Sequence, residues 1–118
     1  MLIGYARTST FDQAAGLDAQ VRDLIAVGVE KVFSEQVSSV DRDRRVKLAE
    51  ALDFIREGDT LIVTKPDRLA RSSAHLHELL ERITAKGAAL RVLSMGLDTG
   101  TATGKLLLSV MGAVAEFE

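Results

Sequence analysis

Two short polar segments of the 118-residue chain contain the side chains best suited to chemistry. The first follows an apolar run, residues 1–6, and places Arg7 two residues before Ser9. A serine hydroxyl can act as a nucleophile, and a nearby guanidinium group can hold an anion against it. A serine that follows a strand is more often a turn residue or a cap, so Ser9 needs support from the rest of the chain.

The second segment reads KPDRLARS and covers residues 65–72. Its Pro66, the only proline of the chain, ends a strand and presets the turn that follows. Asp67 suits the N-cap of the next helix, and by itself it is more often a cap than a catalyst. Arg68 and Arg71 are three residues apart and share one helical face. Two guanidinium groups on one face favour an anion, and phosphate oxygens match their geometry.

A third basic group consists of Arg42, Arg44 and Arg45, with Asp41 before it and Asp43 between Arg42 and Arg44. On its own this group is typical of a solvated face. A serine combined with arginines from three separate segments is more specific, and it suggests phosphoryl chemistry on a phosphodiester.

The chain lacks the sequence motifs of several other kinds of catalytic or binding site. There is no G-x-S-x-G elbow and neither histidine is placed to act as a base for Ser9, which disfavours acyl transfer. Neither GxxxxGK[ST] nor GxGxxG occurs, so a P-loop and a dinucleotide site are not expected. The absence of cysteine excludes disulfides and thiolate metal sites. His75 and His77 lie two apart on a predicted helix, so we expect them to be exposed and to bind no metal. We therefore expect no cofactor and no metal.

The composition indicates one globular domain with a core of its own, because 47% of the residues are hydrophobic and 27% are charged. The net charge of −2 is not typical of a stand-alone nucleic-acid-binding protein, which usually carries an excess of basic residues. A local basic site on an acidic protein remains compatible with this net charge. No signal peptide is visible. The longest nearly apolar run, residues 106–117, is shorter than the ~20 residues that span a bilayer. We expect a soluble cytoplasmic domain without a membrane partner.

Short β-type runs alternate with helical patterns along the chain. Strands are predicted at residues 2–6, 31–33, 60–64 and 89–93. Helical stripes are formed by Leu17, Val21, Leu24 and Ile25, by Leu48, Ala51, Leu52 and Ile55, and by Leu76, Leu79, Leu80 and Ile83. Gly28, Gly58 and Gly87 stand where these helices need a residue with positive φ. The alternation predicts an α/β fold, with a mostly parallel central sheet of about four to five strands flanked by helices.

This fold would bring the polar segments together. Residues 7–10 follow the first predicted strand, and residues 65–68 follow the third. Ligands of open α/β sheets gather at the carboxyl ends of the strands, so we expect the site there.

The C-terminal stretch, residues 103–118, differs from the other helical patterns because it is apolar on nearly every side. Its three consecutive leucines point about 100° apart around a helix. Such a helix needs a second surface to bury against, and we expect a subunit interface; the alternative is the central helix of a monomer. The pattern continues to Glu118 without a helix stop, so we expect a longer parent protein.

The same segments resemble those of a known family. Residues 5–10 with Gln13, the run EGDTLIVTKPDRLARS at 57–72, and residues 97–118 resemble the signatures of serine recombinases, the resolvase/invertase family. The resemblance covers the whole chain in order. It implies a resolvase-like fold and a site-specific recombinase that cuts double-stranded DNA through a 5′-phosphoserine intermediate, without cofactor or metal. It further implies a homodimer that forms a tetramer for strand exchange.

The resemblance also assigns roles. Ser9 would be the nucleophile, and Arg7, Arg68 and Arg71 would bind the scissile phosphate. Arg45 would be a further catalytic arginine. Asp67 would orient Arg68 or exchange a proton near the leaving 3′ oxygen, and Gln13 would position Arg7 or the phosphate.

The implied domain division places a catalytic α/β domain at residues 1–102 and the start of a truncated dimerisation helix at 103–118. The resemblance further implies that the family's C-terminal DNA-binding domain is absent from this chain.

Several positions depart from the family pattern. Thr8 stands where valine is common, Pro66 where leucine is usual, and Phe54 where some relatives carry a basic residue. Val46 replaces a frequent proline, and Ser38-Ser39 replaces a frequent Ser-Gly. Two other functions remain open from the residues alone. One is a non-catalytic oligomerisation module that binds an anion between the first and third strands, and the other is a phosphatase with a serine nucleophile.

Overall fold

Five strands and three helices form the described part of the chain in a computed structural model, which describes residues 1–8, 14–36, 46–65, 69, 73–102, 104–106 and 110. The elements are β1 (Leu2–Thr8), α1 (Ala14–Ala26), β2 (Lys31–Gln36), α2 (Val46–Phe54), β3 (Thr60–Val63), α4 (Ser73–Ala85), β4 (Ala89–Val92) and β5 (Leu97–Asp98), with a 3₁₀ turn at Leu93–Met95 before β5. The predicted α/β alternation is confirmed.

The sheet has the strand order β2-β1-β3-β4-β5. The first four strands are parallel, and only β5 runs antiparallel to its neighbour β4. From β1 the chain passes to β2 on one side, and it then returns to β3 on the other side of β1. The gap between β1 and β3 is therefore the topological switch point, where open α/β sheets bind their ligands.

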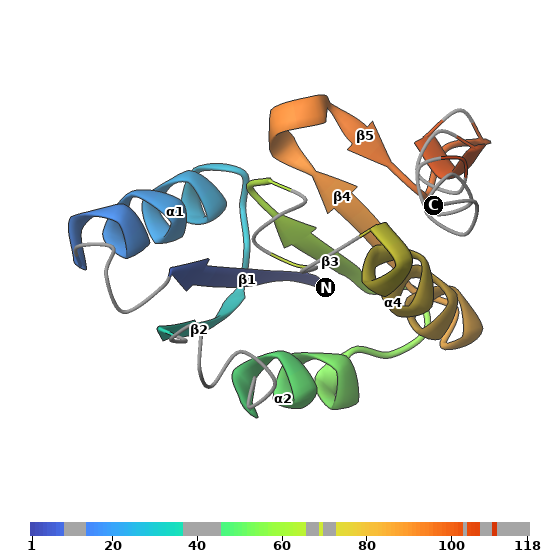
Figure 1. Cartoon of the computed structure of the whole chain (residues 1–118), viewed down its shortest axis with the longest axis horizontal. Coiled ribbons are helices and arrows are strands. Elements are labelled where there is room, and N and C mark those ends of the chain that lie inside the picture. The colour runs from blue at the N-terminus through green and yellow to red at the C-terminus, as the bar shows by residue number, and fades with distance from the viewer. Residues whose placement is uncertain are drawn as a thin grey trace.

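The sheet lies between two helical layers, with α1 on one face and α2 and α4 on the other (Figure 1). Side chains of β1 alternate between the layers, because Ile3 and Tyr5 join the larger core with α2 and α4 whereas Ala6 joins the smaller core under α1. Gly4 also faces α1. A Cβ at this position would lie 3.0 Å from Leu24 Cδ1, so the glycine allows the helix to approach the strand closely.

Three predicted turn glycines have the expected backbone. Gly28, Gly58 and Gly87 have φ angles of 92°, 87° and 77°, which L-residues with a side chain rarely adopt. Gly87 is crowded as well, because an added Cβ would lie 2.8 Å from Cγ of Glu57. Gly28 and Gly87 follow the last turns of α1 and α4 as predicted, but the prediction that Gly58 ends α2 is wrong, because α2 ends at Phe54 and Gly58 lies in the turn before β3.

The elements differ from prediction at several places. The prediction that Ile25 belongs to the buried stripe of α1 is wrong, since its side chain is 60% exposed. Ile25 comes directly after the fully buried Leu24, and successive residues point about 100° apart around a helix. Ile25 therefore points away from the face of α1 that packs on the sheet. The first two strands run further than predicted, to Thr8 and Gln36, because their mutual pairing continues that far.

The start of the C-terminal segment is held by Thr101. The N–H of Lys105 donates to the Thr101 carbonyl at 3.0 Å, and the N–H of Gly104 donates to its hydroxyl Oγ1 at 3.1 Å. Leu106 and Val110 are 63% and 48% exposed. Most of residues 103–118 lie outside the described residues, so the long apolar helix remains a prediction. Among the described residues, no helix is long and apolar enough to cross a membrane.

Candidate phosphate site at the strand switch point

Of the seven predicted site residues, the structure describes Arg7. The others lie outside the described residues: Ser9, Gln13, Arg45, Asp67, Arg68 and Arg71. Their described neighbours show from which elements the site is built. The chain leaves β1 after Thr8, one residue before Ser9, and leaves β3 after Val63, three residues before Pro66.

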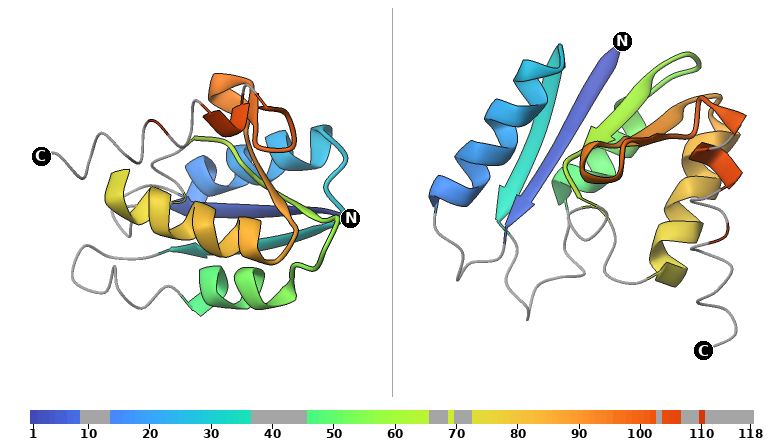
Figure 2. Two further views of the ribbon diagram at one scale, coloured as in Figure 1. Left: turned by 90° about the vertical axis from the view of Figure 1, so that its right-hand side faces the viewer. Right: turned by 90° about the horizontal axis from the view of Figure 1, so that it is seen from above.

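These two exits lie at the same edge of the sheet, because β1 and β3 are parallel neighbours. Figure 2 shows this edge in its right-hand view, where the arrowheads of β1, β2 and β3 point the same way. Lys65 follows β3 here with an exposed side chain. The expectation that the first and third strands end side by side is therefore confirmed, and their ends flank the switch point.

The backbone of Arg7 is held by a buried amide that the sequence interpretation did not select. The Arg7 N–H donates to Oε1 of Gln20 at 3.2 Å, and Nε2 of Gln20 donates to the Arg7 carbonyl at 2.9 Å. Gln20 is only 7% exposed. A signal was present in the sequence, since Gln20 occupies the i+3 position of the stripe that begins at Leu17, and it is the one polar member of that face.

A carboxylate on β2 anchors the start of α2. Glu35 accepts the hydroxyl hydrogen of Tyr5, and it also accepts the N–H groups of Lys47 and Leu48 at 3.2 and 3.1 Å. A carboxylate at a helix N-terminus satisfies free N–H groups and stabilises the helix dipole. The contact fixes the first turn of α2, which begins at Val46, the residue after Arg45 in the sequence. No local pattern identifies Glu35, whose helix partners lie 12 and 13 residues away.

Thr8, which precedes the candidate nucleophile Ser9 in the sequence, has a buried hydroxyl. Its side chain is 1% exposed, and Oγ1 has no hydrogen-bond partner among the described residues. The methyl group lies near Gly16 of α1. A valine would fit the same space without a hydroxyl.

Asp59, which lies at the opposite edge of the sheet just before β3 begins, has a carboxyl pKa below its ordinary value. The backbone N–H of Arg56 lowers the pKa of this carboxyl most, and the hydrogen bond from the Met1 ammonium lowers it further against a smaller opposing effect of burial. The ammonium nitrogen lies 3.1 Å from Oδ1 of Asp59. This shifted carboxylate therefore fastens the N-terminus to the sheet and takes no part in the site.

Phe54, the predicted departure from a basic residue, has a packing role. Its ring lies 5.6 Å from that of Phe33, centroid to centroid, and Nζ of Lys31 lies 5.2 Å from both centroids. The ammonium group of Lys31 therefore supplies a positive charge at this surface, and the faces of the two aromatic rings attract it.

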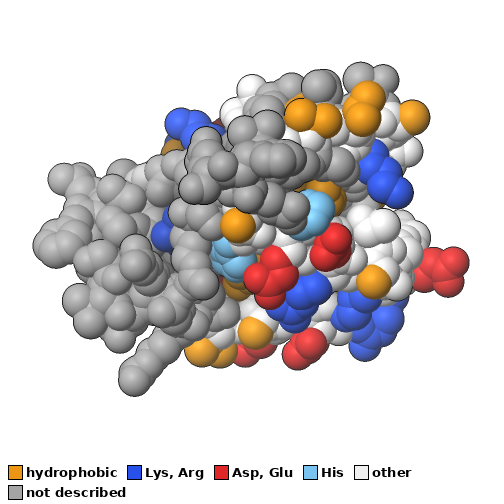
Figure 3. Space-filling model, turned by 45° about the vertical axis from the view of Figure 1, so that its right-hand side comes forward, with side chains coloured by type: hydrophobic (Ala, Val, Ile, Leu, Met, Phe, Trp, Pro, Cys, Tyr) orange, Lys and Arg blue, Asp and Glu red, His pale blue; other side chains and the backbone are white. Residues whose placement is uncertain are grey.

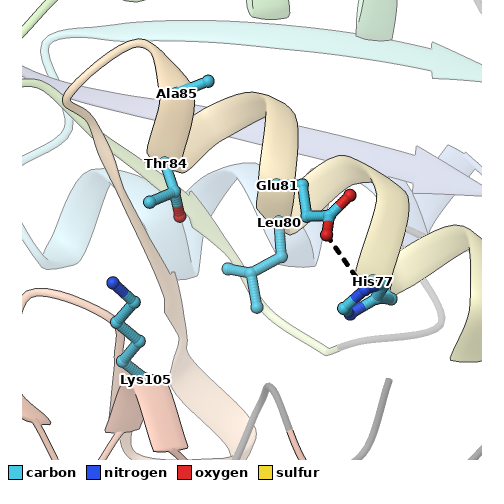
Figure 4. Close-up of a pocket in the computed structure, with 6 residues that line it drawn as sticks. All are labelled: His77, Leu80, Glu81, Thr84, Ala85 and Lys105. Atoms are coloured by element: carbon cyan, nitrogen blue, oxygen red, sulfur yellow. Dashed lines mark ion pairs between the residues drawn. The ribbon is translucent and has the colours of Figure 1, made fainter. Parts of the chain in front are cut away.

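A separate hollow of about 380 Å³ lies between α4 and the C-terminal segment (Figure 4). Nε2 of His77 lies 3.2 Å from Oε1 of Glu81 on its wall, and Lys105 faces α4 from the other side. The prediction that both histidines are exposed is wrong, because each is partly buried. Figure 3 shows acidic and histidine side chains adjoining on this face. Within the described ranges, no group of three His, Cys, Asp or Glu residues could hold a metal ion.

The sheet order, its two helical layers and the basic residues Arg7 and Lys65 near the switch point define an open α/β domain with a candidate anion site at the ends of its strands. Residues 2–118 match the family model described as the resolvase N-terminal domain. The chain therefore belongs to the resolvase N-terminal domain family.

Curated relatives agree with this membership. The serine recombinase gin of Escherichia phage Mu is 42% identical over 118 residues, which is 100% of this chain and 60% of that protein. The Tn917 transposon resolvase of Enterococcus faecalis is 37% identical over 118 residues, 100% of this chain and 62% of that protein. The chain thus spans about three fifths of the length of such relatives.

Solved structures support the fold. The N-terminal catalytic domain of TP901-1 integrase superposes with a TM-score of 0.72 at 24% identity, covering 98% of this chain and 94% of that one. A resolvase-family site-specific recombinase from Streptococcus pneumoniae gives a TM-score of 0.71 at 23% identity, covering 98% and 85%.

Proposed function

We propose that this chain is the catalytic domain of a site-specific DNA recombinase with Ser9 as its nucleophile, acting on double-stranded DNA in the cytoplasm. The observation that carries the proposal is the position of Arg7, the residue two before Ser9, at the β1 end of the switch point in a domain of the resolvase family. Relatives that match the full chain are named as a serine recombinase and as a resolvase.

The proposed reaction is a transesterification. The Ser9 oxygen attacks the phosphorus of a DNA phosphodiester, a new P–O bond forms to serine, and the bond to the 3′ oxygen breaks. The serine proton is lost to solvent or a base, and the departing 3′ oxygen gains a proton. After strand exchange a 3′-hydroxyl attacks the phosphoserine and restores both groups. The covalent link conserves the bond energy, so no nucleotide is consumed.

The arginines supply the fixed positive charge that this reaction needs. We assign Arg7, Arg68 and Arg71 to the scissile phosphate and Arg45 to the same site as a further clamp. Charge that develops on the phosphoryl oxygens is stabilised most by donors that are already in place. We assign Asp67 to orienting Arg68 or exchanging a proton at the 3′ oxygen, and Gln13 to positioning Arg7 or the phosphate.

We further propose that residues 1–102 form the catalytic unit and that residues 103–118 begin a dimerisation helix. Leu106 and Val110 expose more than a third of their apolar surface, which supports a partner on this segment. The active assembly would be a homodimer that pairs into a tetramer on DNA.

A nicked suicide DNA substrate tests the function. The full protein should form a covalent protein–DNA adduct that survives on a denaturing gel, and Ser9→Ala should abolish it. An adduct that persists at wild-type level in Ser9→Ala contradicts the nucleophile assignment. Arg68→Ala should suppress the adduct while the circular dichroism spectrum stays native.

The adduct assay, together with assays of anion binding and of phosphate-ester hydrolysis, separates the two other candidate functions, which family membership does not favour. A non-catalytic module would bind phosphate or sulfate and give no adduct with any substrate. A serine phosphatase would hydrolyse a small phosphate ester in repeated turnovers.

A further inference from the structure

The two sides of β1 are paired unequally. On the β2 side, the N–H of Glu30 donates to the Leu2 carbonyl, and on the β3 side the N–H of Thr60 donates to the Met1 carbonyl. Backbone N–H and C=O groups alternate in direction along a strand, so even-numbered residues of β1 point theirs toward β2 and odd-numbered residues point theirs toward β3. Pairing with β2 continues to Thr8, whereas the register with β3 ends at Gly4. The backbone groups of Arg7 therefore face the β3 side beyond the point where β3 pairing has ended.

Gln20 occupies this place. Its amide gives one acceptor to the Arg7 N–H, at 3.2 Å, and one donor to the Arg7 carbonyl, at 2.9 Å. These are the two bonds that a neighbouring strand would make with the same residue. The amide is buried, so without it two backbone groups would lose their partners inside the protein.

We infer that Gln20 is a positioning residue for DNA cleavage, an inference that rests on the proposed function. The amide makes the two hydrogen bonds that a neighbouring strand would make with Arg7. The end of β1 therefore stays rigid, although no strand fills the switch point beside it. Ser9 follows Arg7 by two residues, and the placement of both depends on the backbone that Gln20 holds. Because phosphoryl transfer is sensitive to the position of the attacking oxygen, a looser Arg7 backbone slows the chemical step more than DNA binding.

The side-chain amide suits this position better than its nearest substitutes. Leucine has a similar volume and can make neither bond with Arg7. A carboxylate can accept the Arg7 N–H, but it places a second acceptor against the Arg7 carbonyl. Cleavage should therefore fall in the order wild type, Gln20→Glu, Gln20→Leu.

Amide hydrogen exchange tests the contact directly in the ¹⁵N-labelled protein. In Gln20→Leu the Arg7 N–H should exchange about tenfold faster, as expected for the loss of one hydrogen bond. The Ala6 N–H faces β2 and should keep its protection, which makes it an internal control. Equal protection of Arg7 in wild type and Gln20→Leu would overturn the inference.

Single-turnover cleavage of the suicide substrate tests the consequence, with DNA affinity measured on the same samples. We expect Gln20→Leu to slow adduct formation by about tenfold to a hundredfold at saturating protein, with DNA affinity changed less than about twofold. Val21→Ala is the matched control, because it trims the next residue of α1 and leaves both Arg7 hydrogen bonds intact. Its cleavage rate should equal that of wild type at a temperature where all variants are folded.

The outcomes separate this inference from the proposed function. If wild-type protein forms no adduct, the proposed function fails, and the positioning role for cleavage fails with it whatever the exchange rates show. If wild type forms the adduct and Gln20→Leu forms it at the same rate, the positioning role alone is overturned. A loss of rate in Val21→Ala equal to that in Gln20→Leu would show only general destabilisation of α1, and this result also overturns the positioning role.

Discussion

The Tyr5 hydroxyl on β1 donates a hydrogen bond to Oε2 of Glu35 on β2, and the same carboxylate accepts two N–H groups from the first turn of α2. One side chain thus ties two strands of the sheet to the helix that follows Arg45. This contact joins the start of α2 to the hydrophobic core, because Tyr5 is fully buried.

Glu35→Ala should destabilise the domain by about 1–2 kcal/mol, since two helix N–H groups and the tyrosine hydroxyl lose their acceptor. Tyr5→Phe should cost about 1 kcal/mol for the loss of one hydrogen bond. Urea unfolding of both variants and of the double variant measures the coupling. We expect the double variant to lose less than the sum of the two, and strict additivity would show that the contact contributes nothing.

Thr8→Val should stabilise the domain by about 1 kcal/mol, because it removes a buried hydroxyl that has no partner among the described residues and keeps the side-chain shape. Differential scanning calorimetry should show a higher Tm. Thr64→Val offers a comparison at a less buried threonine, where the same change should have a smaller effect. A lower Tm for Thr8→Val would show that the hydroxyl makes a stabilising bond.

The lowered pKa of Asp59 predicts a pH dependence with a definite sign. The folded state holds this carboxyl charged below its ordinary pKa of 3.8, so the stabilisation is complete above that value and is lost as the pH falls through the folded pKa. The free energy of unfolding of wild type should exceed that of Asp59→Asn above about pH 5, and the difference should shrink below the ordinary pKa. Urea titrations from pH 2.5 to 7 measure this. A difference that stays constant over the range would contradict the assignment.

Gly104→Ala should release the C-terminal segment from the sheet. An added Cβ would lie 2.1 Å from the carbonyl oxygen of Asp98, which is backbone and cannot rotate away. The hydrogen bonds from Gly104 and Lys105 to Thr101 should therefore weaken. Amide exchange at Lys105 should accelerate by about tenfold, while Leu90 in β4 keeps its protection. Unchanged exchange at Lys105 would show that the chain accommodates the methyl group.

Several features of the fold could be read from the sequence, because they depend on short-range order. Apolar spacing located the helices through Leu48 to Ile55 and Leu76 to Ile83, whose stripe residues are buried as predicted. Gly28 and Gly87 marked the ends of α1 and α4 through a backbone requirement of single residues, whereas Gly58 lies in a turn after α2 has ended. The family signature was also local, and family membership is confirmed over residues 2–118.

The candidate site was only partly predictable. Arg7 and the meeting of the first and third strands followed from the alternation of elements. Glu35 did not, and the polar position of Gln20 on the stripe of α1 did not identify its partner Arg7, because the partners of both residues lie 12 or 13 residues away and are found only once the strands and helices are packed. Ser9 and the remaining predicted residues stay predictions.

The sequence by itself determined the types and order of the elements, since hydrophobic periodicity and turn chemistry act within a few residues. Only the tertiary structure decided that β1 lies between β2 and β3, that its pairing with β3 stops at Gly4, and that a glutamine amide completes the strand. It also decided that Ile25 faces solvent although its helical spacing suits the core. The physical reason is that a buried polar group is stable only beside a complementary partner, and that partner is brought near by the packing of distant segments.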